Sequence, residues 1–134
     1  MEFEELIAAA LAVVAPRRLQ GRLVGDVGAA LVTADGNRYV GVSIDTACGT
    51  GFCAEASAIA AMVTAGEEHI ERIVAVWRDE RDDRIYVLPP CGRCREFVRQ
   101  LHPANLDTEV VLGAQRWSPL RDLLPDHEWP EPVT

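Results

Sequence analysis

The sequence predicts an α/β fold, namely a three-layer α/β/α sandwich with a mixed five-stranded sheet. Three observations lead to this prediction. Segments with helical spacing of apolar residues alternate with short apolar segments that are typical of strands. Two early strands flank a turn, and this hairpin supplies the antiparallel part of the sheet. The 134 residues show no internal repeat and no low-complexity linker, so a single domain over residues 1–134 is expected.

The N-terminal half is expected to open with a helix and to continue as a hairpin. Residues 3–15 carry apolar side chains at helical spacing, and Pro16 ends the run. Residues 27–33, VGAALVT, are small and apolar, as in a buried strand. The turn sequence ADGN follows, and residues 38–44 form the partner strand.

The C-terminal half is expected to alternate helices and strands. Residues 53–66 are rich in Ala and end at Gly66, which predicts a largely buried helix with a glycine at its C-terminus. Ser118 followed by Pro119 is typical of a helix N-cap and first position. The other elements are expected as strands at 72–77, 84–88 and 109–113 and as helices at 94–101 and 118–124.

Composition and charge narrow the choice of partners. The 21 acidic and 13 basic residues leave a net charge of −8, whereas proteins that grip nucleic acid carry a basic surface. No nucleic-acid partner is therefore expected, and a small uncharged or cationic substrate fits better. No apolar run reaches the roughly 18 residues of a membrane span, so no membrane partner is expected.

The N-terminal segment lacks the pattern of a secretory signal. MEFEELIAAALAVVAP begins with Glu2, Glu4 and Glu5, whereas a signal needs a positive start and a small-residue cleavage site. A cytoplasmic location is therefore expected. Under reducing conditions the four cysteines are expected to bind metal or to do thiol chemistry rather than to form two disulfides.

Two loop-to-helix junctions carry the residues that indicate chemistry. GFCAEAS places Cys53 and Glu55 at one helix start, and PPCGRCRE places Cys91 and Cys94 at another. Helix N-termini expose unpaired N–H groups and a partial positive charge, which favour a thiolate. Three thiolates supply three corners of a tetrahedron, and a catalytic zinc site keeps the fourth corner open for water. Zn²⁺ is therefore the expected cofactor, with these three cysteines as its ligands.

Glu55 is the expected catalytic residue. It lies two residues beyond Cys53 and is expected to project into the same cavity without binding the metal. Zinc lowers the pKa of its water to roughly 7, and a neighbouring carboxylate can act as general acid and base. The pattern Cys-x-Glu followed by Pro-Cys-x-x-Cys is the signature of zinc nucleobase deaminases. A CxxC pair alone says little, but the two halves together indicate this chemistry.

On these motifs the sequence resembles the cytidine deaminase family, and within it the blasticidin S deaminase-type members. CAE and PCGRCR match the family's two metal motifs, VGAALVTADG resembles its first-hairpin motif, and LLP occurs at a similar distance near the C-terminus. The resemblance covers roughly residues 5–125. It implies the cytidine deaminase-like fold and hydrolytic loss of ammonia from C4 of a cytosine ring. It also implies a homotetramer in which neighbouring subunits share active sites.

The resemblance further implies a set of substrate contacts. The family carries Asn-x-Glu at the end of the second strand to hold the ribose, and Ser43 and Asp45 stand at the matching positions. Ala54, within the CAE motif, is assigned to the substrate site in the same way. Phe52 precedes the first ligand and packs on the base, against a neighbouring subunit or in the core. Gly25 stands near the position where the family commonly has a Phe that stacks on the base.

A charge argument assigns a role to Arg93. Three thiolates and Zn²⁺ sum to −1, which weakens the metal as a Lewis acid. Many bacterial relatives offset this charge with an Arg directly after Cys-Ala-Glu, where this chain has Ala56. Arg93, inside the Cys-Gly-Arg-Cys turn, is expected to supply the compensation, and blasticidin S deaminases resemble this chain at both positions.

Two other arrangements of the cysteines stay open. With Cys48 as a fourth ligand, five residues before Cys53, the site becomes a closed structural zinc knuckle without a catalytic water. Alternatively, Cys91 and Cys94 form a redox pair, which leaves Glu55 without a role.

Three functions are therefore considered. The first is zinc-dependent deamination of a cytosine nucleoside such as cytidine or deoxycytidine. The second is inactivation of blasticidin S, whose cationic arm suits an acidic protein. The third, from a different class, is a non-catalytic zinc-stabilised module that binds a nucleoside. Among the aromatic residues, Trp77 is expected in the core, and Trp129 is a candidate lid over a pocket.

Overall fold

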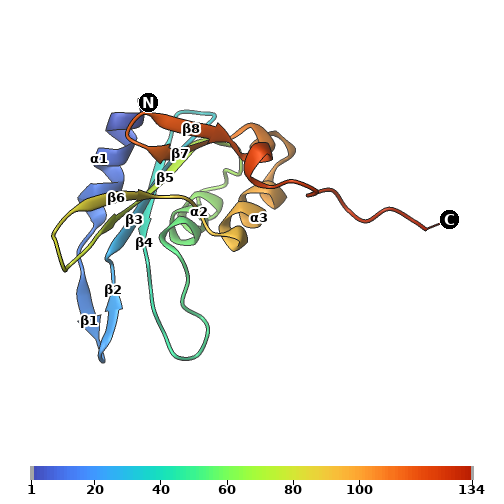
Figure 1. Ribbon diagram of the computed structural model, residues 1–134. Helices are drawn as coiled ribbons and strands as arrows, with labels where there is room; N and C mark the ends of the chain where they lie inside the picture. The colour runs from blue at the N-terminus through green and yellow to red at the C-terminus, as the bar shows by residue number, and fades with distance from the viewer. Residues whose placement is uncertain (1, 134) are drawn as a thin grey trace.

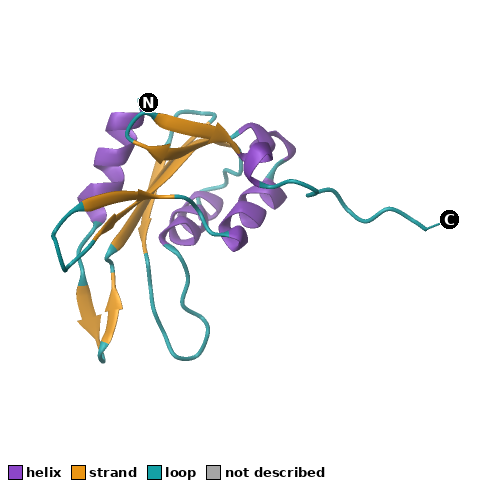
Figure 2. Ribbon diagram, in the orientation of Figure 1, coloured by secondary structure: helices purple, strands orange, loops and turns teal. Residues whose placement is uncertain are grey.

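Three layers make up the body of the protein in the computed structural model, which describes residues 2–133. A central sheet carries helix α1 (Phe3–Val13) on one face and helices α2 (Ala54–Thr64) and α3 (Gly92–Leu101) on the other (Figure 1, Figure 2). The predicted three-layer α/β/α sandwich is therefore confirmed. Among residues 2–133, no helix combines the length and the apolar character that crossing a bilayer requires.

The central sheet is mixed. Its strands lie in the order β4-β3-β5-β7-β8, and β6 pairs with β5 off this path. The β5–β7 pair is parallel, and the other pairs of this sheet are antiparallel. The strands are β3 (Val27–Thr33), β4 (Arg38–Val42), β5 (Ile70–Arg78), β6 (Ile85–Leu88), β7 (Glu109–Gly113) and β8 (Arg116–Pro119).

Strand β3 shows why the sheet is buried on both faces. Ala30 and Val32 pack in the core under α1, whereas Ala29 and Leu31 pack in the core under α2 and α3. Successive side chains of a strand alternate between the two faces, so the apolar run VGAALVT supplies both cores. The predicted bounds of this strand, and its hairpin with β4, are confirmed.

Helix α2 packs directly against β4 at Gly41. A Cβ atom at this position would lie 2.4 Å from the Cβ of Ser57 and 2.5 Å from the backbone nitrogen of Ala58. Real Cβ atoms do not approach other atoms so closely, so the absence of a side chain at Gly41 sets the distance between helix and sheet. This packing places the N-terminus of α2, and with it Cys53, at one end of the sheet.

The C-terminus of α2 forms a Schellman motif. Gly66 adopts φ +93, its N–H donates to the carbonyl of Val63, and the N–H of Glu67 donates to the carbonyl of Met62. The left-handed conformation suits glycine, which has no Cβ penalty there. The predicted glycine end of this helix is confirmed.

Asn105 connects α3 to the start of β5. It lies in the 3-10 helix η1 (Pro103–Asp107) and is fully buried. Its Oδ1 accepts from the N–H of Ile70 at 2.9 Å, and its Nδ2 donates to the carbonyls of Glu68 and Val98 at 3.0 and 2.9 Å. Because every one of these partners is a backbone group, the side chain fixes how α3 sits on the sheet.

The segment after β7 differs from the prediction. Ser118 lies in β8 and pairs with Val110 of β7, so the expectation of a helix over 118–124 with Ser118 as its N-cap is wrong. Only η2 (Leu120–Leu123) turns, as a 3-10 helix. Pairing along the free edge of β7 satisfies backbone groups that a helix start would have left open. The sheet consequently has six strands rather than the five expected.

A small hairpin that the sequence did not predict precedes the central sheet. Strands β1 (Arg17–Leu19) and β2 (Arg22–Val24) form a two-stranded sheet of their own, and the hairpin projects from the body (Figure 1). Its turn residues Gln20 and Gly21 both have positive φ, as two-residue hairpin turns require.

Candidate active site

Two helix N-termini meet at the site. Cys53 occupies the N-cap position of α2, and Cys91 occupies that of α3, each with extended backbone angles. Cys94 lies in the first turn of α3 and is buried. Each cysteine thus stands where unpaired N–H groups and the helix dipole favour a negative charge.

A bridge closes the loop that leads into α2. The N–H of Phe52 donates to the carbonyl of Ile44 at 2.9 Å, and the N–H of Ile44 donates back at 3.1 Å. Inside the loop, the N–H of Gly51 donates to the hydroxyl of Thr46 at 2.8 Å. Because Cys53 directly follows this bridge, its position is tied to the sheet rather than to a free loop.

The sulfur atoms of the three cysteines form one cluster. The Sγ atoms of Cys53, Cys91 and Cys94 lie within 4.8 Å of one another, and those of Cys53 and Cys91 are 3.7 Å apart. Two sulfurs at about 2.3 Å from one tetrahedral zinc ion stand about 3.8 Å apart. A disulfide would need about 2.05 Å, and all three thiols are free. The geometry therefore fits a zinc ion held by three sulfurs.

Cys48 lies outside this cluster. Its thiol contacts the hydroxyls of Thr46 and Thr50, at 3.5 and 3.3 Å, on an exposed part of the loop. These contacts lower the pKa of Cys48 to about 7. The arrangement favours three sulfur ligands over the closed four-sulfur knuckle. A redox pair of Cys91 and Cys94 alone does not explain a third sulfur beside them.

The pKa values of the three thiols determine which protons a bound cation has to displace. Burial raises the pKa of Cys94, and the negative charges of its neighbours raise it further. Burial and the nearby Cys91 thiol also raise the pKa of Cys53. Burial acts in the same direction on Cys91, but hydrogen bonds from the Cys94 backbone N–H and from the Cys53 thiol outweigh it, so its pKa is lowered. Zinc binding therefore has to displace protons, which makes it pH-dependent.

Glu55 stands beside the sulfurs without joining them. It is the second residue of α2, it is 6% exposed, and the metal-binding cluster does not include its carboxylate. Burial raises the pKa of Glu55 above its ordinary value, and a hydrogen bond from its own backbone N–H offsets part of this rise. The negative charge of Glu55 in turn raises the pKa of Cys94 and that of Cys53.

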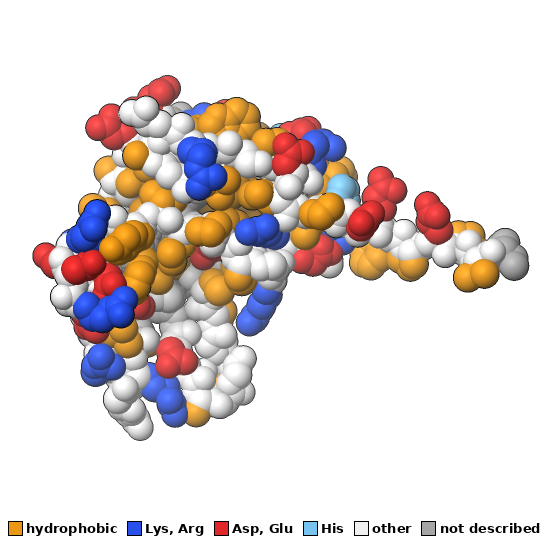
Figure 3. All heavy atoms as spheres, in the orientation of Figure 1, with side chains coloured by type: hydrophobic (Ala, Val, Ile, Leu, Met, Phe, Trp, Pro, Cys, Tyr) orange, Lys and Arg blue, Asp and Glu red, His pale blue; other side chains and the backbone are white. Residues whose placement is uncertain are grey.

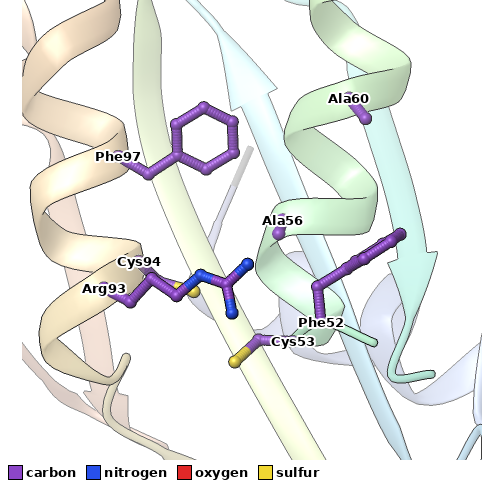
Figure 4. Close-up of a pocket in the computed structure, with 7 residues that line it drawn as sticks. All are labelled: Phe52, Cys53, Ala56, Ala60, Arg93, Cys94 and Phe97. Carbon is purple, nitrogen blue, oxygen red and sulfur yellow. The ribbon is translucent and has the colours of Figure 1, made fainter. Parts of the chain in front are cut away.

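A cavity of about 400 Å³ opens between α2 and α3 over the cluster. Figure 4 shows the side chains of Arg93 and Phe97 reaching from α3 toward α2, with the sulfurs of Cys53 and Cys94 beside the guanidinium. Arg93 and Phe97 share a helix face because they are four residues apart. The lining residues are Phe52, Cys53, Ala56, Ala60, Arg93, Cys94 and Phe97.

The predicted substrate contacts separate into two groups. Phe52 lines the cavity, whereas Ser43, Asp45 and Ala54 are not among its lining residues. The Ser43 hydroxyl donates to Oδ1 of Asp26 at 3.1 Å and accepts from a backbone N–H at 3.2 Å. Ala54 is fully buried in the core under α2, and Asp45 is exposed on the loop. The Ser43 hydroxyl therefore has no proton left to donate to a sugar, although its oxygen can accept one further hydrogen bond.

Phe97 and Ala60 line the cavity although the sequence analysis did not single them out. The signal was available, because Phe97 lies three residues after Cys94 on a predicted helix, and such residues share a face. Trp129 does not line this cavity. It is 72% exposed, and its ring packs against the guanidinium of Arg99 at 5.4 Å. Trp77 is half-buried at the end of β5 rather than in the core.

Comparison with known proteins assigns the family. Residues 3–110 match the model of the cytidine and deoxycytidylate deaminase zinc-binding region. The chain belongs to the cytidine and deoxycytidylate deaminase family. Zinc is the metal that this family region binds, and the three-sulfur cluster is the group of side chains among residues 2–133 that fits it.

Relatives in this family include two curated bacterial proteins. A blasticidin-S deaminase from Bacillus cereus is 41% identical over 81 residues, which are 58% of this chain and 58% of that protein. A cytidine deaminase from Halalkalibacterium halodurans is 38% identical over 88 residues, which are 65% of this chain and 61% of that protein. The chain thus spans about three fifths of the length of these two relatives.

Solved structures support the same fold over nearly the whole chain. A mutant cytidine deaminase from Mycobacterium tuberculosis superimposes with a TM-score of 0.76 at 26% sequence identity. The alignment covers 96% of this chain and 99% of that one. The cytidine deaminase-like fold expected from the sequence is therefore confirmed.

Proposed function

We propose that this protein is a zinc-dependent aminohydrolase that removes the C4 amino group of a cytosine nucleoside. One observation carries the proposal. The sulfurs of Cys53, Cys91 and Cys94 are spaced for a single zinc ion. The buried carboxylate of Glu55, two residues after Cys53, raises the pKa of Cys53 and Cys94 without being a ligand. A site with three protein ligands leaves one position for water, which is the arrangement of hydrolytic zinc enzymes.

The reaction replaces the C4 amino group by an oxygen and needs two protons to be moved. Zinc, when bound, supplies a Lewis acid that brings the pKa of a water molecule to about 7. Glu55 takes a proton from the attacking water and delivers it to the ring nitrogen N3. A second proton from the same oxygen passes through the Glu55 carboxylate to the amino nitrogen, the C4–N bond breaks, and ammonia leaves. Burial, which raises the pKa of Glu55, helps the carboxyl to hold a proton between these transfers.

The residues of the cavity wall provide a surface for the nucleoside base and a positive charge beside the thiolates. The cavity volume of about 400 Å³ lies within the range of small-molecule sites. The Phe97 ring and Ala60 provide an apolar wall against which a base can lie. The Arg93 guanidinium supplies a positive charge beside the sulfurs of Cys53 and Cys94 (Figure 4). The charge of three thiolates exceeds that of Zn²⁺, so this positive charge offsets part of the surplus. Asp45, which is exposed on the loop, contacts the part of the nucleoside that extends beyond the cavity, whereas the Ser43 hydroxyl is held by Asp26 and the Ala54 side chain lies in the core.

The proposal is tested with zinc-loaded protein and a panel of cytosine nucleosides. Loaded protein should release ammonia and the matching uracil nucleoside in equal amounts. Glu55→Gln, which keeps the shape of the side chain but cannot accept a proton, should retain one zinc per chain and lose turnover. Turnover that survives in Glu55→Gln, or a fully loaded protein that spares every cytosine nucleoside, would contradict the proposal. The second result would favour the non-catalytic nucleoside-binding module.

Blasticidin S is the second candidate substrate. The relative from Bacillus cereus is named a blasticidin-S deaminase, and this chain carries a net charge of −8, which suits the antibiotic's cationic arm. Comparison of kcat/KM for blasticidin S and cytidine decides between the two. A blasticidin S value that exceeds the cytidine value tenfold or more, and that falls with added salt, would make the antibiotic the preferred substrate.

We further propose a homotetramer of chains that each form one deaminase-like domain over residues 1–134. The proposal is supported by exposed apolar side chains on the helices that flank the cavity. Phe97 is 38% exposed on α3, and Val63 is 46% exposed on α2. A second copy packed there would bury both and would close the cavity. Sedimentation equilibrium is the test, and a monomer at micromolar concentration would contradict this part.

The cytoplasm is the proposed compartment, and a small molecule is the proposed partner. All four cysteines are free, as expected under reducing conditions. On the face seen in Figure 3, basic and acidic side chains are interspersed. Such a surface, with a net charge of −8, does not suit nucleic acid or an anionic membrane.

A further inference from the structure

Arg95 makes two hydrogen bonds that join distant parts of the chain. Its Nε donates to the carbonyl oxygen of Pro90 at 2.8 Å, and its Nη1 donates to the carbonyl oxygen of Leu123 at 3.0 Å. Arg95 follows Cys94 on α3, yet it does not line the cavity. Its role is therefore separate from that of Arg93, which does line the cavity.

The first bond acts on the peptide that leads into a metal ligand. Pro90 is buried and directly precedes Cys91. The Pro90 carbonyl and the Cys91 nitrogen belong to one planar peptide unit, so a bond to that oxygen fixes the plane from which Cys91 extends. The ring of Pro90 already restricts the backbone on the other side of this unit. The main freedom left to the Cys91 thiol is rotation about its own side chain.

The second bond provides a rigid anchor. Leu123 is the last residue of η2, a turn whose first residue, Leu120, is 1% exposed in the core. The N–H of Leu120 also donates to the carbonyl of Thr108 at 3.0 Å. The anchor of Arg95 is therefore part of the packed body and not a mobile end.

We propose that Arg95 is a positioning residue that holds Cys91 in place for metal binding by bridging the ligand loop and the C-terminal turn η2. The planar guanidinium makes this possible, because its N–H donors point in fixed, diverging directions and can reach carbonyl oxygens on two different elements. The inference rests on the proposed function in one respect, since Cys91 has to be a zinc ligand. Loss of the Arg95 bridge should therefore speed zinc release more than it lowers the melting temperature of the metal-free protein.

The matched control is Arg99, one turn further along the same helix. The Nε–H of Arg99 donates to the carboxylate of Glu96 at 2.9 Å, and within residues 2–133 Arg99 forms no hydrogen bond or ion pair with the ligand loop. Full-length Arg95→Met, Arg95→Lys, Arg99→Met and Arg99→Lys are purified with zinc bound. The rate of zinc transfer to a chromophoric chelator is measured for each variant, together with the melting temperature of its metal-free form.

Arg95→Met should release zinc about 10- to 100-fold faster than the wild type, as is typical when a group that supports a ligand is removed. The zinc release rate of Arg95→Lys should lie between those of the wild type and Arg95→Met, because an ammonium group reaches one carbonyl but cannot bridge both. The Arg99 variants should match the wild type. Arg95→Lys also serves if Arg95→Met does not fold.

Cobalt substitution gives a second readout that is independent of turnover. The visible bands of Co²⁺ bound to thiolates report directly on the geometry of the sulfurs, and they should shift in Arg95→Met and stay unchanged in Arg99→Met. The inference is overturned if Arg95→Met releases zinc at the wild-type rate with unchanged cobalt bands, or if it melts at a lower temperature without releasing zinc faster. It is also overturned if Arg99→Met accelerates release equally, or if Arg95→Lys restores the wild-type rate in full. A wild-type protein that binds no zinc would instead overturn the proposed function.

Discussion

The Sγ atom of Cys53 lies 3.7 Å from the Sγ atom of Cys91, although 38 positions of the chain separate the two residues. This distance links the N-terminus of α2 to that of α3, and the contacts between the two helices are otherwise few. A metal ion bound by both cysteines would therefore join α2 to α3 and add to the few contacts between them.

Removal of zinc by a chelator should lower the melting temperature by about 10 °C or more. A ligand present at a thousand times its Kd stabilises the folded state by about 4 kcal/mol, and that free energy is lost with the metal. Cys53→Ser should reproduce the loss, whereas Cys48→Ser should keep both zinc and stability. Differential scanning calorimetry with metal analysis provides the measurement. A Cys48→Ser protein that loses its zinc would point back to a four-sulfur site.

Glu55→Gln should stabilise the metal-free protein at neutral pH. Burial raises the pKa of Glu55 in the folded state, so the folded protein binds a proton more tightly than the unfolded chain does. The stability that Glu55 contributes is therefore present below its unfolded pKa of about 4.3 and is lost as pH rises through the folded pKa. The variant should melt higher than the wild type at pH 7, and the difference should vanish near pH 4. A difference of the same size at both pH values would exclude ionisation of Glu55 as its cause.

Arg93→Ala should keep zinc and lower kcat roughly 10- to 100-fold. The guanidinium stands beside the sulfurs in the cavity wall (Figure 4), where its charge offsets the surplus negative charge of three thiolates. Arg93→Lys retains the charge and should recover part of the rate. Turnover is measured per bound zinc. Loss of zinc with normal turnover in the loaded fraction would show that Arg93 acts on the metal's retention instead.

Gly41→Ala should cost about 1–3 kcal/mol of unfolding free energy, the usual penalty of overpacking. The new Cβ would fall 2.4–2.7 Å from atoms of Ser57 and Ala58, so α2 must move away from β4. Gly92→Ala is the control, because a Cβ there meets no atom within 4 Å. Urea denaturation of the two variants gives the comparison. Equal stability of both would mean that α2 adapts freely to the added methyl group.

The parts of the fold that the sequence predicts are those in which local pattern and burial agree. VGAALVT is apolar at all positions before Thr33 because both faces of β3 are covered, and its bounds are read correctly from the sequence. The two cysteine-bearing helix starts are also read correctly, because a proline pair and a bridge-closing loop precede them. Here each local preference points to the structure that forms.

Other parts depend on contacts that no local pattern contains. Ser118 and Pro119 have the sequence of a helix start, yet pairing with β7 makes them a strand. The hairpin β1–β2 consists mainly of exposed residues, so it lacks the alternation that identifies a half-buried strand. Its turn depends on positive φ at Gln20, a residue that is uncommon in that conformation.

The candidate site divides in the same way. The metal-binding trio and Glu55 follow from the spacing of two short motifs, since helix geometry fixes the residues close behind each helix start. The substrate contacts stay predictions, because the Ser43 hydroxyl donates to Asp26 and the Ala54 side chain packs in the core, which are contacts that motif spacing does not contain. Arg95 gave no signal in the sequence, since its partners Pro90 and Leu123 meet only in the folded chain.

The most direct test of the account is zinc X-ray absorption spectroscopy on protein loaded with one zinc ion per chain. The zinc ion should have three sulfur neighbours at about 2.3 Å and one oxygen or nitrogen neighbour at about 2.0 Å, and Cys91→Ser should remove one of the sulfurs. Four sulfur neighbours, or a zinc ion bound without sulfur, would contradict it.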